Sequence, residues 1–270
     1  MRLSSAVAKL TEAGIDEARL EARILFSKIG KINECELLFD PECDSAELEE
    51  ALERRCRRIP LAYILGEVDF YRENYVVSPD CLIPRPETEL LVDYAVNHIP
   101  CGARFADICT GSGCIAVSTL KNTKSTTALA LDLSHAALEI ARENAERNGV
   151  SDRIEFIRGD ALVGIEGEFF AILSNPPYVS EAAYADLDAE IYEEPKMAFV
   201  GGVDGGDFYR KMIPLYKNNL KDGGFLAFEI GYDQGELLRS LGAMHGMETE
   251  IIKDYGGLDR IAILKNSSLT

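Results

Sequence analysis

The sequence lacks the paired cysteines that organise disulfide frameworks and zinc sites. Seven cysteines are present, an odd number at irregular spacing, and no C-x-x-C pair occurs. This pattern argues against both kinds of site and predicts reduced thiols in a cytoplasmic protein. Cys109 and Cys114 flank a glycine-rich turn and could chelate a metal, but packing as small apolar residues is the better interpretation. We therefore expect no metal.

Long apolar runs and an excess of basic residues are also absent. No stretch suggests a signal peptide or is long enough to cross a bilayer, so we expect no membrane partner. The 46 acidic residues outnumber the 28 basic ones, which gives a net charge of −18. Non-specific affinity for nucleic acid depends on neutralising phosphates, so this charge argues against such binding while leaving room for a local basic site.

Two different patterns divide the chain. Over residues 1–62, apolar residues recur at helical spacing, with one helix expected from Asp44 to Arg58, and we predict a bundle of about four helices. From residue 87 onward, strands and helices alternate, which predicts a mostly parallel sheet with helices on both faces. The expected helices of this part include 88–97, 135–148 and 207–220. The expected strands are 104–109, 126–133, 153–160, 169–174, 224–230, 247–253 and 260–265, the last of them antiparallel.

A glycine-rich turn follows the first strand of the predicted sheet. Residues Gly111 to Ala116 match G-x-G-x-x-A and open a helix, whose free N–H groups can hold a ligand. Asp132 ends the next strand, where a carboxylate can accept hydrogen bonds from a ribose. The order strand, glycines, helix, strand and acid predicts a site for NAD or S-adenosylmethionine, with a plain turn as the alternative.

Asp107 favours S-adenosylmethionine over NAD. It lies just before the turn, where a dinucleotide would bring its pyrophosphate, and a carboxylate repels phosphates but attracts a sulfonium or an ammonium. Alternatively, Asp107 points away and caps a backbone group, as short acids often do in turns. Asp160 ends the third strand, where it could accept a hydrogen bond from the adenine amino group or be a plain loop acid.

The stretch Asn175-Pro-Pro-Tyr178 ends the fourth strand, because two prolines cannot donate to a sheet. The side-chain oxygen of Asn175 and the carbonyl of Pro176 could accept both hydrogens of an NH₂ group and aim its nitrogen at a methyl donor. Tyr178 offers a π face. Such a transfer demands no metal and no general base, since the proton can leave to water. A strand-ending turn with an asparagine cap is the alternative.

The glycine turn and this tetrad together resemble class I S-adenosylmethionine-dependent methyltransferases that act on planar NH₂ groups. Adenine-N6 DNA methyltransferases and glutamine-N5 protein methyltransferases both carry such tetrads. Other stretches resemble the HemK/PrmC family over nearly the whole chain, with Cys109 as a departure where many members have glycine. These stretches are Pro60–Gly66, Phe70-Tyr71, Leu82–Leu90, Glu194-Pro195, Gly201–Gly205 and Phe228–Gly231.

The runs Val68–Tyr71 and Tyr75–Val77 flank Arg72–Asn74 and predict a hairpin in the linker at 67–86. Around this linker, the resemblance implies a helical bundle at 1–66 that recognises the protein substrate and a Rossmann-like, seven-stranded class I methyltransferase domain at 87–270. It implies methyl transfer from S-adenosyl-L-methionine to the side-chain nitrogen (N5) of the glutamine in the Gly-Gly-Gln motif of class-1 peptide chain release factors. The product would be S-adenosyl-L-homocysteine. We expect a monomer with no stable nucleic-acid partner.

By position, the resemblance also assigns residues. Those implied to be catalytic are Asn175, Pro176 and Tyr178. Those implied to bind cofactor are Asp107, Thr110, Gly111, Gly113, Asp132, Leu133, Asp160, Ala161 and Asn175. Those implied to bind substrate are Asn175, Pro176, Pro177, Tyr178, Arg85 and Glu87. The loop Arg85–Glu89 would roof the pocket or simply link the domains.

The main alternative is an adenine-N6 nucleic-acid methyltransferase with the same tetrad. It would need a surface for duplex DNA and would have to flip the base, yet residues 1–80 contain 11 basic and 17 acidic residues. The run Arg54–Arg58 could contact a release factor or RNA, although a solvated helix end is the better interpretation. A binding module without catalysis and an NAD dehydrogenase are weaker alternatives. The intact Asp132 and Asn175 argue against the first, and the double proline is unexplained by the second.

Overall fold

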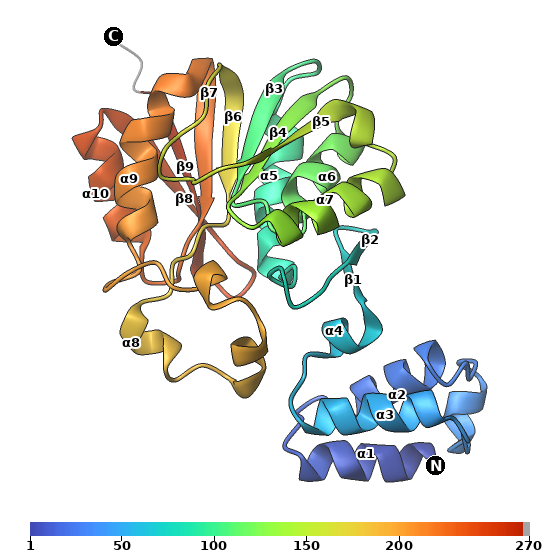
Figure 1. The fold of residues 1–270 in the computed structure, drawn as a ribbon. Coiled ribbons are helices and arrows are strands. Elements are labelled where there is room, and N and C mark those ends of the chain that lie inside the picture. Colours follow the sequence, from blue (N-terminus) through green and yellow to red (C-terminus); the bar gives the residue numbers. More distant parts are fainter. Residues whose placement is uncertain (267–270) are drawn as a thin grey trace. The chain divides into compact units, whose positions relative to one another are not determined.

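The computed structural model describes residues 1–266, which form two compact units (Figure 1). The first comprises residues 1–68 and 188–193, and the second comprises residues 69–187 together with those from 194 onward. A hairpin of β1 (Glu67–Phe70) and β2 (Glu73–Val76) connects them along the chain. Within the described residues, no helix has the length and apolar character needed to cross a membrane.

The second unit is built on a seven-stranded sheet in the order β5-β4-β3-β6-β7-β9-β8. The strands β3 to β7 pair in parallel, and β9 pairs antiparallel with both β7 and β8. The predicted fold class, including the antiparallel last strand, is therefore confirmed. The strands are β3 (Arg104–Ile108), β4 (Thr127–Asp132), β5 (Ile154–Arg158), β6 (Phe169–Ser174), β7 (Leu220–Glu229), β8 (Met247–Lys253) and β9 (Asp259–Asn266).

Helices cover both faces of this sheet. Alternate residues of a strand face opposite sides, so Ala106 and Ile108 of β3 pack with α9 and α10, whereas Asp107 faces α6. Figure 1 shows α6 and α7 near β3, β4 and β5, and α9 and α10 near β7, β8 and β9. The helices are α5 (Glu89–His98), α6 (Cys114–Asn122), α7 (His135–Arg147), α8 (Glu181–Tyr184), α9 (Asp207–Tyr216) and α10 (Gly235–Met244).

The second unit differs most from expectation at α9 and α10. The helix predicted over 207–220 ends at Tyr216, because a 3₁₀ turn follows and β7 already begins at Leu220. Helix α10 was not expected, since Gly235 and Gly242 lie inside it and glycine disfavours helix. Both glycines are needed for packing: an added Cβ would lie 2.2 Å from Asp259 and 2.0 Å from Thr249, respectively.

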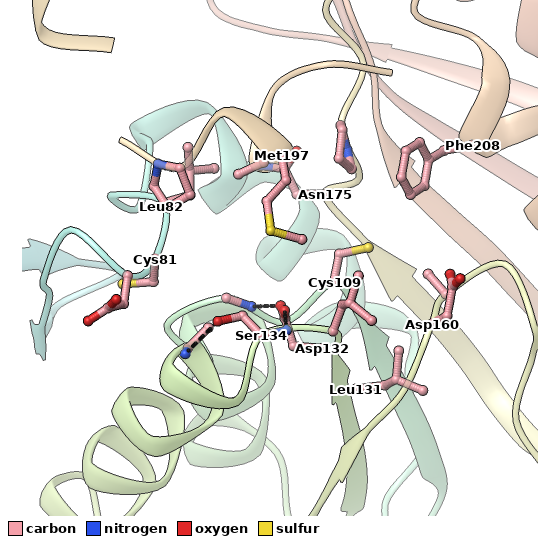
Figure 2. Close-up of a pocket in the computed structure, with 18 residues that line it drawn as sticks. Cys81, Leu82, Cys109, Leu131, Asp132, Ser134, Asp160, Asn175, Met197 and Phe208 are labelled. Atoms are coloured by element: carbon pink, nitrogen blue, oxygen red, sulfur yellow. Dashed lines mark hydrogen bonds between the residues drawn. The ribbon is translucent and has the colours of Figure 1, made fainter. Parts of the chain in front are cut away.

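The strand order creates the crevice in which a ligand can bind. From β3 the chain proceeds outward to β4 and β5, and then crosses to β6 on the other side of β3. Loops at the carboxyl ends of β3 and β6 therefore lead in opposite directions, which opens a crevice above these strands. Figure 2 shows Asp132, Asp160 and Asn175, each from the end of a different strand, around one pocket.

The first unit is a small helical bundle with its own apolar core. Its helices are α1 (Leu3–Glu12), α2 (Ala18–Lys28), α3 (Ala46–Cys56) and α4 (Leu61–Leu65). Leu10, Leu25 and Leu48 are fully buried where the first three helices meet. The helix expected from Asp44 to Arg58 is shorter than predicted. Ser45 caps its start by accepting a hydrogen bond from the Leu48 N–H, and Arg58 has φ of 68°, which is not helical.

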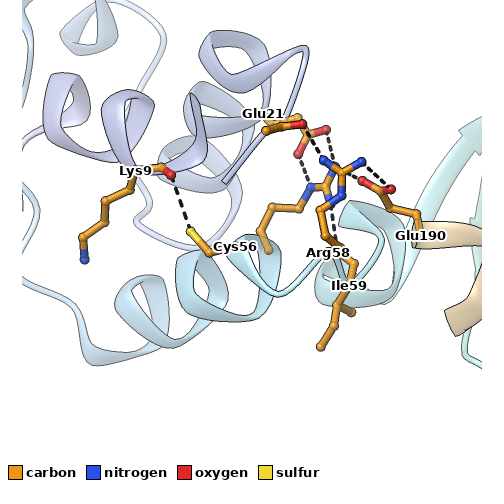
Figure 3. Close-up of polar contacts among 8 residues, drawn as sticks. Lys9, Glu21, Cys56, Arg58, Ile59 and Glu190 are labelled. Atoms are coloured by element: carbon orange, nitrogen blue, oxygen red, sulfur yellow. Dashed lines mark hydrogen bonds and ion pairs between the residues drawn. The ribbon is translucent and has the colours of Figure 1, made fainter. Parts of the chain in front are cut away.

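A buried cluster of charges closes one end of this bundle (Figure 3). Arg55 is only 5% exposed, and its guanidinium donates to Glu21 Oε1 at 3.1 Å and to Glu190 Oε1 at 3.0 Å. Arg58 donates to the other oxygen of Glu190 at 2.8 Å. The interpretation of the run Arg54–Arg58 as a solvated helix end is therefore wrong for Arg55. Its role is to pair two acids, one of which comes from the segment 188–193.

We expect Arg55→Ala to lower the free energy of unfolding by about 3 kcal/mol, because it leaves two largely buried carboxylates without their shared partner. Circular dichroism during urea titration would measure the loss. The matched control is Arg57→Ala, which removes an exposed arginine of the same run and should change stability by less than about 0.5 kcal/mol. Equal effects of the two substitutions would contradict a stabilising role for the cluster.

Candidate functional site

One pocket lies at the carboxyl ends of β3, β4, β5 and β6 (Figure 2). The turn after β3 contributes Cys109 and Gly111, and the turn after β4 contributes Asp132 and Ser134. The structure brings together part of the predicted site, and these residues share the pocket wall. They are Gly111, Asp132, Leu133, Asp160, Ala161, Asn175 and Pro177.

Asp132 ties two of the pocket's turns together. Its Oδ2 accepts a hydrogen bond from the Gly111 N–H at 2.8 Å, and its Oδ1 accepts one from the Ser134 N–H at 2.9 Å. Burial raises the pKa of Asp132, although these backbone donors oppose the shift. Each carboxylate oxygen can accept more than one hydrogen bond, so both can still receive a donor from a ligand.

Asp107 does not lie on the pocket wall. It is fully buried beneath the glycine turn, where its Oδ2 accepts from the Thr110 hydroxyl at 2.6 Å and from the Ala116 N–H at 3.1 Å. It therefore caps the start of α6. This agrees with the alternative interpretation, in which Asp107 points away from the ligand and caps a backbone group. Its Oδ1 is buried with no hydrogen-bond partner among the described residues. Gly113 also serves packing, since an added Cβ would lie 3.0 Å from the Cβ of Ala141.

Asp160 and its neighbours form a more open part of the pocket. Asp160 is exposed, and its Oδ1 accepts a hydrogen bond from the Leu162 N–H at 2.8 Å. Ala161 is buried beside it, and Leu133 is 49% exposed at the end of β4. This side of the pocket thus combines one carboxylate with apolar surface, a combination that suits a flat ring carrying an amino group.

The tetrad Asn175-Pro-Pro-Tyr178 stands at the end of β6. The Nδ2 of Asn175 donates to the hydroxyl of Thr88 at 3.2 Å, and the Tyr178 hydroxyl donates to Glu229 Oε1 at 3.1 Å. Burial, together with the neighbouring carboxylate, raises the pKa of Tyr178 well above its usual value. Asn175 and Pro177 line the pocket, whereas Pro176 is buried and Tyr178 turns its hydroxyl toward Glu229.

A glycine-rich loop, residues 201–205, packs against the backbone of this tetrad. A Cβ added to Gly201 would lie 2.4 Å from the Pro177 carbonyl oxygen, and one added to Gly205 would lie 2.1 Å from that of Tyr178. The side chain of Gln234 donates to the Tyr178 carbonyl at 3.1 Å. Only glycine permits this close approach, so the loop fixes where the tetrad stands.

The loop Arg85–Glu89 is held in place by its own polar contacts. Arg85 forms an ion pair with the buried Glu194, which also accepts a hydrogen bond from the Ile83 N–H at 3.0 Å. Glu87 is exposed, and neither Arg85 nor Glu87 lines the pocket. Thr88 of this loop contacts the tetrad directly: its hydroxyl donates a hydrogen bond to Glu229 and accepts one from Asn175.

Sequence reasoning missed several lining residues. Met197 and Phe208 reach the pocket from segments that follow the tetrad, and no local pattern marks them (Figure 2). Ser134 carries a signal that could have identified it, because a serine directly before a helix is a preferred N-cap, and its hydroxyl does accept from the Ala137 N–H. The other missed residues are Asp80, Cys81, Leu82, Cys109, Leu131, Ala137, Pro195 and Ala198.

The charge of the lining limits the ligands that fit. Carboxylates of Asp80, Asp132 and Asp160 line the pocket, and among the described residues no lysine or arginine does. This field disfavours a pyrophosphate and favours a cation. Burial raises the pKa of the Cys109 thiol, which disfavours its reactive thiolate form.

Two known protein families match successive parts of this chain. A family model described as the PrmC N-terminal domain matches residues 3–66, and one described as the methyltransferase small domain matches residues 86–199. A release factor glutamine methyltransferase from Moorella thermoacetica is 36% identical over 268 residues, which cover 96% of this chain and 95% of the relative. The chain belongs to the release factor glutamine methyltransferase family.

Other relatives of this methyltransferase agree. The release factor glutamine methyltransferase of Nitratidesulfovibrio vulgaris is 36% identical over 97% of this chain and 92% of its own length. The crystal structure of a ribosomal protein L11 methylase from Lactobacillus delbrueckii subsp. bulgaricus has a TM-score of 0.52 and 20% identity, covering 70% of this chain and 83% of that one. That similarity supports the fold of the methyltransferase alone.

Asp107 gives this methyltransferase a pH-dependent stability that can be measured. Burial raises the pKa of Asp107 to about 7. An acid whose pKa is higher in the folded protein stabilises it while protonated, and this contribution is lost as the pH rises from about 4 through 7. We expect the free energy of unfolding of wild type, relative to Asp107→Asn, to fall by roughly 3 kcal/mol between pH 5 and pH 8.

Urea denaturation of the ligand-free protein at several pH values would measure that difference. The matched control is Asp152→Asn, which replaces an exposed acid and should follow wild type at every pH. A difference between wild type and Asp107→Asn that does not change with pH would contradict the raised pKa.

Proposed function

We propose that this protein transfers a methyl group from S-adenosylmethionine to the side-chain nitrogen of the glutamine in the Gly-Gly-Gln motif of class-1 peptide chain release factors. One observation carries the proposal most directly. Asn175, whose amide nitrogen is already engaged by Thr88, stands at the edge of a carboxylate-lined pocket with its oxygen left as an acceptor. A substrate NH₂ group is the donor that this acceptor requires.

The chemistry of the lining fits S-adenosylmethionine better than a dinucleotide. S-adenosylmethionine carries a sulfonium and an ammonium, and the pocket offers carboxylates without a lysine or arginine in the described wall. We propose that Asp132 accepts from the ribose hydroxyls, that Asp160 and Ala161 hold the adenine end, and that Leu133 covers it. When bound, this cofactor supplies an electrophilic methyl group on sulfur.

Three of the residues expected at the cofactor act indirectly in this proposal. Asp107 caps α6 and accepts from Thr110, so both hold the shape of the glycine turn. Gly113 lets α6 approach α7 at Ala141. The contact with the cofactor then falls to Gly111 and its neighbours on the pocket wall.

The chain's own residues contribute to the reaction by positioning. The Asn175 side-chain oxygen and the Pro176 carbonyl accept the two N–H groups of the glutamine amide and direct its nitrogen at the methyl carbon, and Tyr178 and Pro177 shape the space around it. A bound S-adenosylmethionine would supply the methyl group, and its sulfur would keep the electron pair of the C–S bond that breaks as the new N–C bond forms. The positive charge that develops on nitrogen is stabilised by both acceptors until a proton leaves to water.

We further propose that the bundle at residues 1–66 recognises the release factor, as a domain distinct from the catalytic one at 87–270. We also propose that the enzyme acts as a monomer. Release factors act on ribosomes, so we propose that the reaction takes place in the cytoplasm. Arg85, held by Glu194, would keep the loop above the pocket in place.

Methyl transfer from labelled S-adenosylmethionine to an unmodified class-1 release factor tests the proposal. We expect label on the side-chain nitrogen of the Gly-Gly-Gln glutamine, located by mass spectrometry, and none on a Gly-Gly-Ala factor or on duplex DNA. The variant Asn175→Ala should lower kcat by about 100-fold, because it removes an acceptor of the transition state, with cofactor Kd changed by less than about threefold.

The matched control for this variant is Asn97→Ala, which replaces an exposed asparagine of α5 and should retain wild-type kcat. Label on DNA would instead favour the adenine-N6 reaction. A loss of cofactor affinity in Asn175→Ala as large as the loss of kcat would contradict the assignment of Asn175 to the substrate.

A further inference from the structure

We propose that Thr88 and Glu229 are positioning residues that hold the Asn175 amide with its oxygen toward the substrate. The inference rests on the proposed function and assigns roles to two residues outside the tetrad. They come from distant parts of the chain, since Thr88 lies directly before α5 and Glu229 ends β7. Their side chains meet in the interior, where Thr88 is 2% exposed and Glu229 is 1% exposed.

Four side chains, those of Asn175, Thr88, Glu229 and Tyr178, form a continuous series of three hydrogen bonds. Thr88 Oγ1 and Glu229 Oε2 are 2.5 Å apart, and Asn175 Nδ2 is 3.2 Å from Thr88 Oγ1. The other carboxylate oxygen, Oε1, accepts from the Tyr178 hydroxyl at 3.1 Å. One carboxylate therefore determines the orientation of two of the four residues in the tetrad.

The donor and acceptor of each hydrogen bond in this series follow from the number of protons that each group carries. The Thr88 hydroxyl has a single proton, which it donates to Glu229 Oε2. The Thr88 oxygen can then act toward Asn175 only as an acceptor. Asn175 must present its NH₂ group to Thr88, and its side-chain oxygen is consequently directed away from Thr88.

This orientation decides whether Asn175 can assist the reaction. An asparagine amide has nearly the same shape when its oxygen and nitrogen are exchanged, so packing alone does not distinguish the two orientations. In the reversed orientation an NH₂ group would face the substrate NH₂ group, and no hydrogen bond could form between them. The hydrogen bond from Asn175 to Thr88 removes this ambiguity before the substrate binds.

The cost of burying Glu229 argues that the arrangement serves more than packing. Burial raises the pKa of this carboxyl group, and the hydrogen bonds from Thr88 and Tyr178 oppose the shift. An apolar pair of similar size would fill the same space without burying a charge. The carboxylate supplies what an apolar pair cannot, which is an acceptor that sets the direction of both hydrogen bonds.

The test compares Thr88→Val with Thr88→Ser. Valine keeps the shape of threonine but removes the hydroxyl, and serine keeps the hydroxyl but removes a methyl group. We expect Thr88→Val to lower kcat by about 10- to 50-fold, with cofactor Kd and the KM for the release factor within about twofold of wild type. Thr88→Ser should retain kcat within about threefold of wild type. If Thr88→Val does not yield folded protein, Thr88→Ala removes the same hydroxyl and gives the same readouts.

Two results would overturn the inference while wild type methylates the release factor: wild-type kcat in Thr88→Val, or equal losses in the valine and serine variants. The side-chain amide signals of Asn175 in a ¹⁵N–¹H spectrum, identified by their disappearance in Asn175→Ala, provide a readout that does not depend on the substrate. They should shift in Thr88→Val and stay in place in Thr88→Ser. If wild type failed to methylate release factors, the proposed function would fall, and these signals would still decide on the orientation of Asn175.

Discussion

The need of buried carboxylates for hydrogen-bond donors organises this site. A carboxylate removed from water is costly unless N–H or O–H groups surround it. Asp107 at the end of β3 accepts hydrogen bonds from the Thr110 hydroxyl and the Ala116 N–H, and Asp132 at the end of β4 accepts them from the backbone of the turns after β3 and β4. Each acid thus converts a flexible turn after a strand into a fixed wall of the pocket.

The same principle extends to the loops that would hold the substrate. Glu229 accepts hydrogen bonds from the hydroxyls of Thr88 and Tyr178. Glu194 forms an ion pair with Arg85 and accepts a hydrogen bond from the Ile83 N–H. The structure therefore supports a mechanism in which positioning is the main contribution of the protein. An amide nitrogen is a weak nucleophile, so acceptors that are held in place before binding do more for the reaction than a base would.

Much of the fold could be predicted from local patterns. Apolar runs placed all seven strands to within a few residues, and the two prolines after β6 marked its end. The polar residues at strand ends were also found, because parallel strands bring their carboxyl ends to one edge. Local reasoning failed where a residue's role depends on a distant partner. It could not show that Arg55 pairs with Glu190, since 135 positions separate them.

The sequence also could not predict the direction in which a side chain points. Asp107 could point into the pocket or under the turn, and only the position of α6 decided between them. Met197 and Phe208 reach the pocket because the chain after the tetrad folds back over it, which no spacing records. Thr88 was visible within a recognised stretch, but its contact with Glu229 depends on how β7 lies beside the start of α5.

A crystal structure with S-adenosylhomocysteine and a peptide containing Gly-Gly-Gln would test the positioning of the substrate most directly. We expect the glutamine side-chain nitrogen to lie about 3 Å from both the Asn175 side-chain oxygen and the Pro176 carbonyl oxygen, with the Asn175 nitrogen still on Thr88. A glutamine bound elsewhere, or an Asn175 whose nitrogen faces the substrate, would contradict the mechanism.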